Sequence, residues 1–203
     1  MDVAALRCAA DLALGPHGDL RARAALTSAR ITVTRDVRAW EGSEGEVHAH
    51  RVLLGLDAAT LGALRASPAA HDALVEALAA GLAETRGHTL ESLELEWAVA
   101  FGPASAYRGT AKGDVHRDDV DELRRAAIAY LDAGPDEVEN ALSVEAMRTA
   151  TLRLSTQPSG VRWLAITVSA RAPAASRRLC ACVEDLLGPG SRAFLYEHAS
   201  GDD

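Results

Sequence analysis

Residues 2–10 read DVAALRCAA and residues 119–127 read DVDELRRAA, so six of nine positions are identical. Apolar residues recur at helical spacing in both stretches. A Gly-Pro pair follows each predicted helix, at Gly15-Pro16 and at Gly134-Pro135. The predicted elements that come after each stretch also have the same order, which weighs more than identities in an alanine-rich chain. We therefore predict a tandem duplication of one α-α-β-β-α-β unit.

The first copy contains three predicted strands. Residues 30–37 and 46–56 alternate between apolar and polar side chains, and the glycine-containing segment between them predicts a hairpin. A helical region over about 57–82 is interrupted at Ser67-Pro68, where serine is a favourable N-cap and proline suits a first helical turn. A third alternating strand follows at 93–101. Strand-helix-strand crossovers are right-handed, so this strand is expected to run parallel to the second.

The second copy repeats this order. Residues 151–155 and 161–170 predict a hairpin, residues 173–187 a helix and residues 192–198 a last strand. If the strand at 93–101 leads into this copy, the order becomes β-α-β-β-α-β, which is ferredoxin-like. We expect an α+β protein with antiparallel or mixed sheets that carry helices on one face. The predicted division is a first repeat, a linker, a second repeat and a tail, at residues 1–101, 102–118, 119–199 and 200–203.

Composition narrows the function classes. The 203 residues carry a formal net charge of -8, and the basic residues are scattered, so we expect neither nucleic acid nor a membrane surface as partner. Three cysteines form no disulfide or zinc pattern, and residues 1–14 do not resemble a signal peptide. These features favour a cytoplasmic protein. Twenty arginines against one lysine indicate a GC-rich bacterial genome.

Two histidines are candidate metal ligands. His48 and His50 lie two residues apart on a predicted strand, so both rings face the same side and could share a metal ion. His71, on the apolar stripe of a predicted helix, could supply a third ligand. Val52 and its apolar neighbours share the histidines' face, however, which favours a pair of histidines at the polar rim of the core.

The predicted linker carries the basic residues Arg108, Lys112 and Arg117 and several glycines. These residues could bind an anion, but the spacing is not that of a phosphate-binding loop. We interpret the segment as a tether between the two repeats. Glu94 and Glu96 share one face of a strand, and without an accompanying nucleophile we interpret that face as solvated.

The strand at 161–170 is apolar on both faces. Val161, Trp163 and Ala165 lie opposite the side chains of Leu164 and its alternating neighbours. Either the sheet is covered on both sides within the chain, or one face is open to a partner. The residues Val161, Trp163 and Ala165 are therefore candidates for an interface.

The sequence contains no nucleophile with a base, no metal cage and no cofactor cradle, so we expect no cofactor and lean away from an enzyme. The leading hypothesis is a non-catalytic protein-protein interaction module, an accessory or adaptor component of a bacterial complex, with a protein partner or self-association. One alternative is a small-molecule sensor with its pocket between the repeats. A weaker alternative is a metal-dependent enzyme around His48 and His50.

Overall fold

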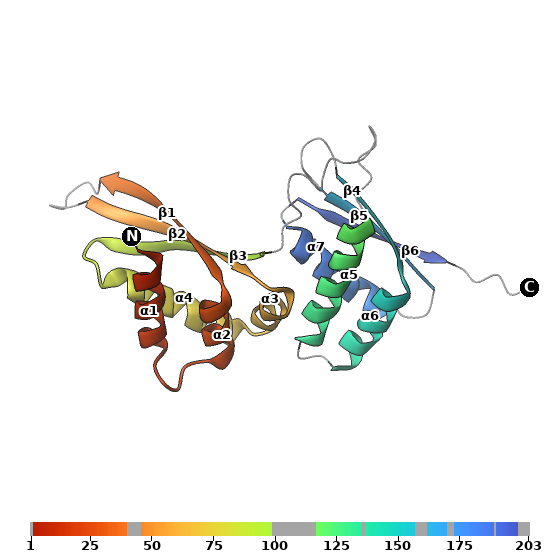
Figure 1. Ribbon diagram of the computed structural model, residues 1–203, viewed down its shortest axis with the longest axis horizontal. Helices are drawn as coiled ribbons and strands as arrows, with labels where there is room; N and C mark the ends of the chain where they lie inside the picture. The colour runs from red at the N-terminus through yellow and green to blue at the C-terminus, as the bar shows by residue number, and fades with distance from the viewer. Residues whose placement is uncertain are drawn as a thin grey trace, which may run out of the picture. The chain divides into compact units, whose positions relative to one another are not determined.

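The chain divides into two compact units, Met1–Ala98 and Val99–Asp203. A computed structural model describes residues 2–39, 46–98, 117–134, 137–156, 162–169, 173–188 and 190–198. Each unit is a mixed α+β arrangement around one three-stranded sheet (Figure 1). Most of the predicted linker, residues 102–116, and the predicted tail lie outside the described residues, whereas residues 117–118 begin a helix. The exact domain boundaries stay predictions.

The elements of the first unit follow the predicted order. They are α1 (Val3–Leu14), α2 (Leu20–Ser28), β1 (Arg30–Ala39), β2 (Glu46–Leu56), α3 (Ala58–Arg65), α4 (Pro68–Ala83) and β3 (His88–Trp97). The predicted interruption of the long helical region is confirmed, because the Ser67 hydroxyl accepts a hydrogen bond from the backbone N–H of Ala70 and Pro68 opens α4. Strand β3 begins earlier than predicted, at His88. Residues 99–101 of the predicted strand lie outside the described residues.

The first sheet has the strand order β1-β2-β3. Strands β1 and β2 are antiparallel and β2 and β3 are parallel, which confirms the predicted crossover. The register places Ile31 opposite Leu54, and Leu54 opposite Leu95. A register shift between His50 and Arg51 interrupts the pairing of β2 with β3.

The second unit contains six described elements. They are α5 (Arg117–Asp132), α6 (Glu137–Thr149), β4 (Thr151–Thr156), β5 (Arg162–Ser169), α7 (Pro173–Leu187) and β6 (Arg192–His198). Strand β5 pairs antiparallel with β4 and parallel with β6. Strand β3 belongs to the first sheet, and the second sheet has three strands among the described residues. The predicted ferredoxin-like order needed β3 as the first strand of the second unit, so this order is not confirmed.

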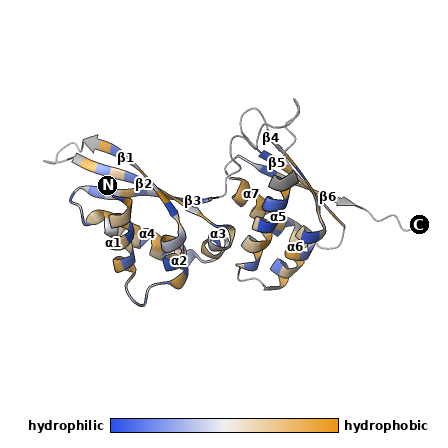
Figure 2. Ribbon diagram, in the orientation of Figure 1, coloured by the Kyte–Doolittle hydropathy of each residue, from blue (hydrophilic) through white to orange (hydrophobic). Residues whose placement is uncertain are grey.

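Helices cover one face of each sheet (Figure 1). Alternate strand residues point toward these helices, as period-two alternation requires. In the first unit this buries Val52, Leu54 and Leu56 of β2. In the second unit Leu164, Ile166 and Val168 of β5 are buried in the same way. Figure 2 shows hydrophobic and hydrophilic residues following one another along the helices, as expected for helices that pack on a sheet by one face.

The identical residues of the repeated nine-residue stretches include core residues in both units. Among them, leucine and two alanines are buried in each copy: Leu6, Ala9 and Ala10 in α1, and Leu123, Ala126 and Ala127 in α5. Small side chains at these positions let the crossover helix approach closely. A Cβ added at Gly81 of α4 would lie 3.1 Å from the backbone nitrogen of Ala10. In the second unit the Cys182 Sγ of α7 lies 3.6 Å from the carbonyl oxygen of Ala127.

One arginine of the repeated stretch has the same contacts in both units. In the first unit Arg7 of α1 donates hydrogen bonds to the carbonyl oxygens of Thr27 (2.7 Å) and Ala29 (2.6 Å), where α2 leads into β1. In the second unit Arg124 of α5 donates to the carbonyl oxygens of Met147 and Ala150, where α6 leads into β4. A guanidinium group suits this role because it presents several N–H donors in one plane.

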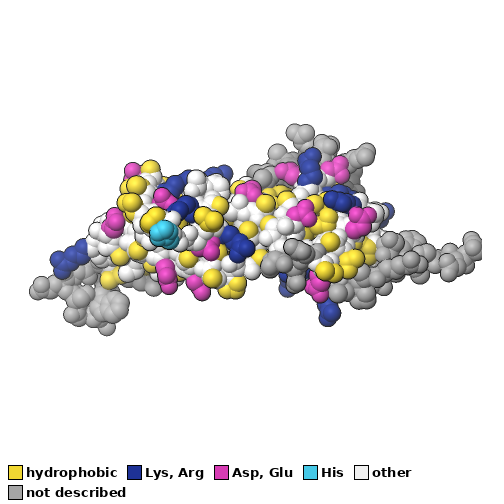
Figure 3. Space-filling model, turned by 90° about the horizontal axis from the view of Figure 1, so that it is seen from below, with side chains coloured by type: hydrophobic (Ala, Val, Ile, Leu, Met, Phe, Trp, Pro, Cys, Tyr) yellow, Lys and Arg dark blue, Asp and Glu magenta, His cyan; other side chains and the backbone are white. Residues whose placement is uncertain are grey.

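The helix-covered side of the units carries acidic and basic side chains interspersed with apolar ones (Figure 3). Neither sign gathers into a stripe on the face shown. Among the described residues, no helix combines the length and the apolar composition needed to cross a bilayer.

Candidate functional site

The face of the second sheet that points away from the helices is formed by alternate residues of β4, β5 and β6. The register aligns them in three rows: Ser155, Trp163 and Arg192; Arg153, Ala165 and Phe194; and Thr151, Thr167 and Tyr196. Side chains on neighbouring strands of one face lie close enough to interact. The strand pairing therefore brings residues from two hairpin strands and a distant third strand onto one continuous surface.

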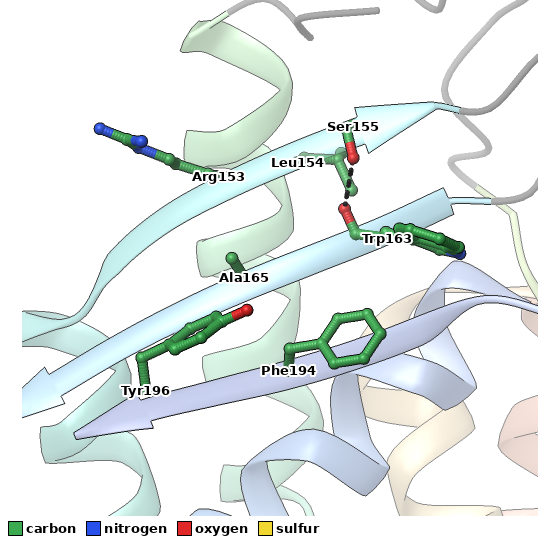
Figure 4. Close-up of a pocket in the computed structure, with 7 residues that line it drawn as sticks. All are labelled: Arg153, Leu154, Ser155, Trp163, Ala165, Phe194 and Tyr196. Atoms are coloured by element: carbon green, nitrogen blue, oxygen red, sulfur yellow. Dashed lines mark hydrogen bonds between the residues drawn. The ribbon is translucent and has the colours of Figure 1, made fainter.

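Three aromatic side chains dominate this surface. Trp163, Phe194 and Tyr196, which we call the aromatic patch, are 44%, 43% and 56% exposed. The rings of Trp163 and Phe194 meet edge to face with their centroids 5.8 Å apart. The three aromatic residues and the small side chain of Ala165 border an open hollow of about 480 Å³ (Figure 4).

The exposure of Trp163 follows from the opposite face of its strand. Leu164 and Ile166 are fully buried against the helices, so Trp163 and Ala165 must point away from the core. The prediction that β5 has two apolar faces is thus confirmed for its described residues, and Trp163 stands on the side that is open to solvent. The third interface candidate, Val161, lies outside the described residues.

The charge on this face is of one sign. Arg153 of β4 and Arg192 of β6 flank the aromatic patch, and the described side chains of the three rows include no Asp or Glu. The full chain has a net charge of -8. A face that combines aromatic rings with arginine is rich in the residue types that dominate binding energy at protein interfaces.

The corresponding face of the first sheet is polar. Its third strand presents Glu91, Glu94 and Glu96, all exposed, and the Nε of Arg51 on β2 lies 3.0 Å from Glu91 Oε2. The prediction that Glu94 and Glu96 lie on a solvated face is confirmed by their exposure.

A second group of side chains lies in the first unit. His48, His50 and His88, which we call the histidine cluster, share the helix-covered face at one end of β2 and β3. His50 Nε2 lies 2.9 Å from His88 Nδ1. The His88 ring also contacts the other two, with centroid distances of 4.7 Å to His48 and 4.9 Å to His50. His50 is 1% exposed, whereas His48 and His88 are half-buried.

The cluster favours neutral imidazoles. Burial lowers the pKa of His50 below its ordinary value, and the neighbouring His88 and His48 rings lower it further. Desolvation likewise lowers the pKa of His88, with added contributions from His48 and Arg35. Both shifts have the same physical origin, because a positive charge in this place loses water and meets other positive groups.

The structure places the other predicted ligands elsewhere. His71 on α4 is 41% exposed at its side chain, and its Nδ1 lies 3.6 Å from Asp72 Oδ1. Within the described residues, His88 and not His71 contacts the pair formed by His48 and His50. Arg108 and Lys112 of the predicted anion-binding loop lie outside the described residues, and Arg117 is the first residue of α5.

Metal-ligating residues in the described ranges form no group of three or more that is arranged to hold a metal ion. In the histidine cluster, two of the ring nitrogens already face each other at hydrogen-bond distance. Cys182 is buried in the core, and burial raises the pKa of its thiol well above the ordinary value. Cys180, two residues away on the same helix, is half-buried.

Sequence reasoning missed Phe194, Tyr196 and His88. The stretch RAFLYEH of β6 is apolar at both alternating sets of positions, so the periodicity does not tell which set faces the helices. Only the parallel register with β5 puts Phe194 next to Trp163 and Tyr196 on the same face. The sequence did contain one signal: Phe194 and Tyr196 are two residues apart, so in a strand both side chains point to the same face.

Comparisons of the chain with protein-family profiles and with curated proteins find no match.

Proposed function

We propose that this chain is a non-catalytic interaction module that binds a partner protein through the aromatic patch. The observation that carries the proposal is the exposure of three large aromatic side chains on one open sheet face. Exposed apolar clusters of this kind mark interaction sites more often than scattered single residues do. Aromatic anchors and arginine also contribute disproportionately to the binding energy of protein interfaces.

The charge of the face favours a partner other than a second copy. Arg153 and Arg192 are the charged residues among the described side chains of the face. A symmetric dimer through this face would bring the same arginines of both copies into one interface, where like charges oppose association. A partner that presents apolar side chains edged by carboxylates complements both the rings and the arginines. Self-association is the second possibility that the experiment must test.

Single-stranded nucleic acid is the competing ligand class, because bases also stack on aromatic residues of open sheets. Such sites need a positive groove that follows the phosphate backbone. Here two arginines stand on the face of a chain whose net charge is -8. The balance of charge therefore supports a protein partner.

We also infer that the two units arose by tandem duplication. The support is the repeated role of three kinds of residue: the arginines Arg7 and Arg124, the buried leucines and the paired alanines. Each arginine joins its first helix to the backbone just before a hairpin. In this view the first copy kept a polar open face and the second acquired the aromatic patch. We place such a module in the bacterial cytoplasm as an accessory or adaptor component of a complex.

Affinity purification of the full chain from its native cell tests this proposal. Trp163→Ala and Phe194→Ala should each deplete a stoichiometric co-purifying protein at least tenfold while leaving the circular dichroism spectrum unchanged. Glu94→Ala, on the open face of the first sheet, is the matched control and should retain the partner. Equal recovery with all three variants would contradict the proposal.

Two further measurements separate the competing ligands. Sedimentation of the purified chain should show a species whose mass does not depend on Trp163, because self-association is not the expected mode. Fluorescence polarisation with labelled single-stranded RNA and DNA should show no binding that Trp163→Ala abolishes. A patch-dependent dimer, or patch-dependent oligonucleotide binding, would replace the proposed partner by a second copy or by nucleic acid.

A further inference from the structure

The histidine cluster is an unusual polar feature at the edge of a hydrophobic core. His50 follows the same face as Val52 and Leu54 and is almost completely buried. Its Nδ1 is buried without a hydrogen-bond partner among the described residues, while its Nε2 is paired with His88. Buried polar atoms are usually paired, so an unpaired one in such a place calls for an explanation.

The cluster ties two strands together at one end of the sheet. His48 and His88 are directly paired across β2 and β3, and the His48 backbone N–H donates to the carbonyl oxygen of Gly87 at 2.8 Å. The side-chain bond from His50 to His88 adds a second connection between the same strands. Two residues farther along β2, the register shift after His50 interrupts the regular pairing. The histidine side chains therefore connect β2 and β3 next to the place where their backbone pairing is irregular.

A hydrogen bond between two imidazoles depends on their protonation. It needs one ring nitrogen with a proton and one without. When both rings are protonated, two N–H groups face each other across the 2.9 Å gap and the bond is lost. A protonated His50 carries a donor on each ring nitrogen, and its buried Nδ1 has no acceptor among the described residues. Both effects oppose the folded arrangement at acidic pH.

None of the described residues whose charges shift the pKa of His50 or His88 is negative. On β1, Arg35 is aligned with His50. The charged groups of the described residues that act on His50 are His88 of β3, His48 of β2 and Arg35 of β1. The covering helices α1 and α4 contribute no charged group to that set. Protonation thus adds positive charge to a place that is already positive.

We propose that the histidine cluster is a pH-sensitive latch, which joins β2 to the start of β3 while its imidazoles are neutral and releases this end of the first sheet when they are protonated. The direction of the effect follows from linkage. A histidine with a lowered pKa binds protons more weakly in the folded than in the unfolded chain. The unfolded state therefore gains protons first as the pH falls below about 6.5, and folding stability falls with it.

Hydrogen exchange of the full chain tests the latch. After correction for the intrinsic pH dependence, amides of β2 and β3 should exchange several-fold faster at about pH 5.5 than at about pH 7.5, on either side of the ordinary histidine pKa. His88→Gln should reduce this dependence, since glutamine does not titrate and the bond between two imidazoles is gone. His71→Gln, an exposed histidine in the same unit, is the matched control and should leave it unchanged.

Two results would overturn the latch. One is an equal corrected exchange rate of β2 and β3 at both pH values in the unsubstituted chain. The other is a pH dependence in His88→Gln as large as that of the unsubstituted chain. If His88→Gln is too unstable to study, proton NMR titration of the unsubstituted chain decides, because the pKa values of His50 and His88 should lie below the ordinary histidine value of about 6.5. Stabilisation by added Zn²⁺ that His88→Gln removes would assign the cluster to metal binding instead.

Discussion

The open faces of the two sheets differ far more than their cores do. In both units a leucine of the central strand, Leu54 or Leu164, is fully buried against helices. On the opposite side, the third strand presents Glu94 and Glu96 in the first unit, whereas it presents Phe194 and Tyr196 in the second. Both units thus bury one apolar face of the sheet against helices. They differ in the side chains on the opposite, exposed face.

This contrast locates function more sharply than either unit does alone. A polar open face is what a sheet in water needs, because antiparallel and mixed sheets commonly leave one side solvated. An aromatic face costs solubility and is expected to persist only where it is used. If the units share an ancestor, the first shows what the fold requires and the second shows what was added to it.

The largest expected effect concerns the buried cores, which are alike in the two units. Leu54→Ala and Leu164→Ala should each lower the free energy of unfolding by about 2–5 kcal/mol, because each leaves a cavity in a closed core. Chemical denaturation followed by circular dichroism measures the loss, and hydrogen exchange shows which unit is affected. A loss below about 1 kcal/mol at one of the two sites would mean that the units do not have equivalent cores.

The second prediction concerns the repeated arginine. Arg7→Ala and Arg124→Ala should each cost about 1.5–3 kcal/mol, because each removes hydrogen bonds from a charged donor to backbone carbonyls. Arg→Lys at either position should recover only part of the loss, since an ammonium group cannot reach separate carbonyls in one plane. Thermal and chemical denaturation of the four variants measures this. A cost at one site only would argue against a shared structural role.

Much of this comparison could be predicted from the sequence, because local signals decide it. Strand β2 was expected at 46–56 and α7 at 173–187, and the structure has both elements at these bounds. The residues around Leu164 also indicated that β5 is apolar on both faces, but they left open whether the second face is covered within the chain or open to a partner. The predictions were weakest at β3, where the polar start of the strand, from His88 to Glu91, carries no clear alternation.

The candidate sites needed information that periodicity lacks. His88 lies 38 residues from His50 in the sequence and comes beside it only through the parallel pairing of β2 with β3. His71 was considered as a possible third ligand because it stands on an apolar helical stripe, yet its side chain is 41% exposed. Helical spacing gives the direction of a side chain only to within a broad sector of the helix surface. It therefore does not tell whether a residue at the edge of a stripe reaches the sheet.

The third prediction replaces the aromatic residues on the open face of the second sheet by the acidic residues found on the open face of the first. Phe194→Glu combined with Tyr196→Glu gives β6 the acidic pattern of β3. The double variant should change the free energy of unfolding by no more than about 1 kcal/mol, because the substituted side chains are exposed. Co-purification of the partner should nevertheless be lost. Denaturation curves beside affinity purification separate the two effects, and unfolding of the variant would show that the aromatic patch supports the second unit itself.

The smallest expected effect is on the polar face of the first sheet. Arg51→Ala removes the ion pair with Glu91, whose two side chains are 57% and 25% exposed. Water screens such a pair, so the expected loss is about 0–1 kcal/mol. The loss should shrink further in about 1 M salt, where the screening length is about 3 Å. Chemical denaturation of the unsubstituted chain and of Arg51→Ala, at low and at high salt, measures this loss of stability. A larger, salt-independent loss would mean that the first open face is a structural surface in its own right, and the contrast with the aromatic face would then have to be drawn differently.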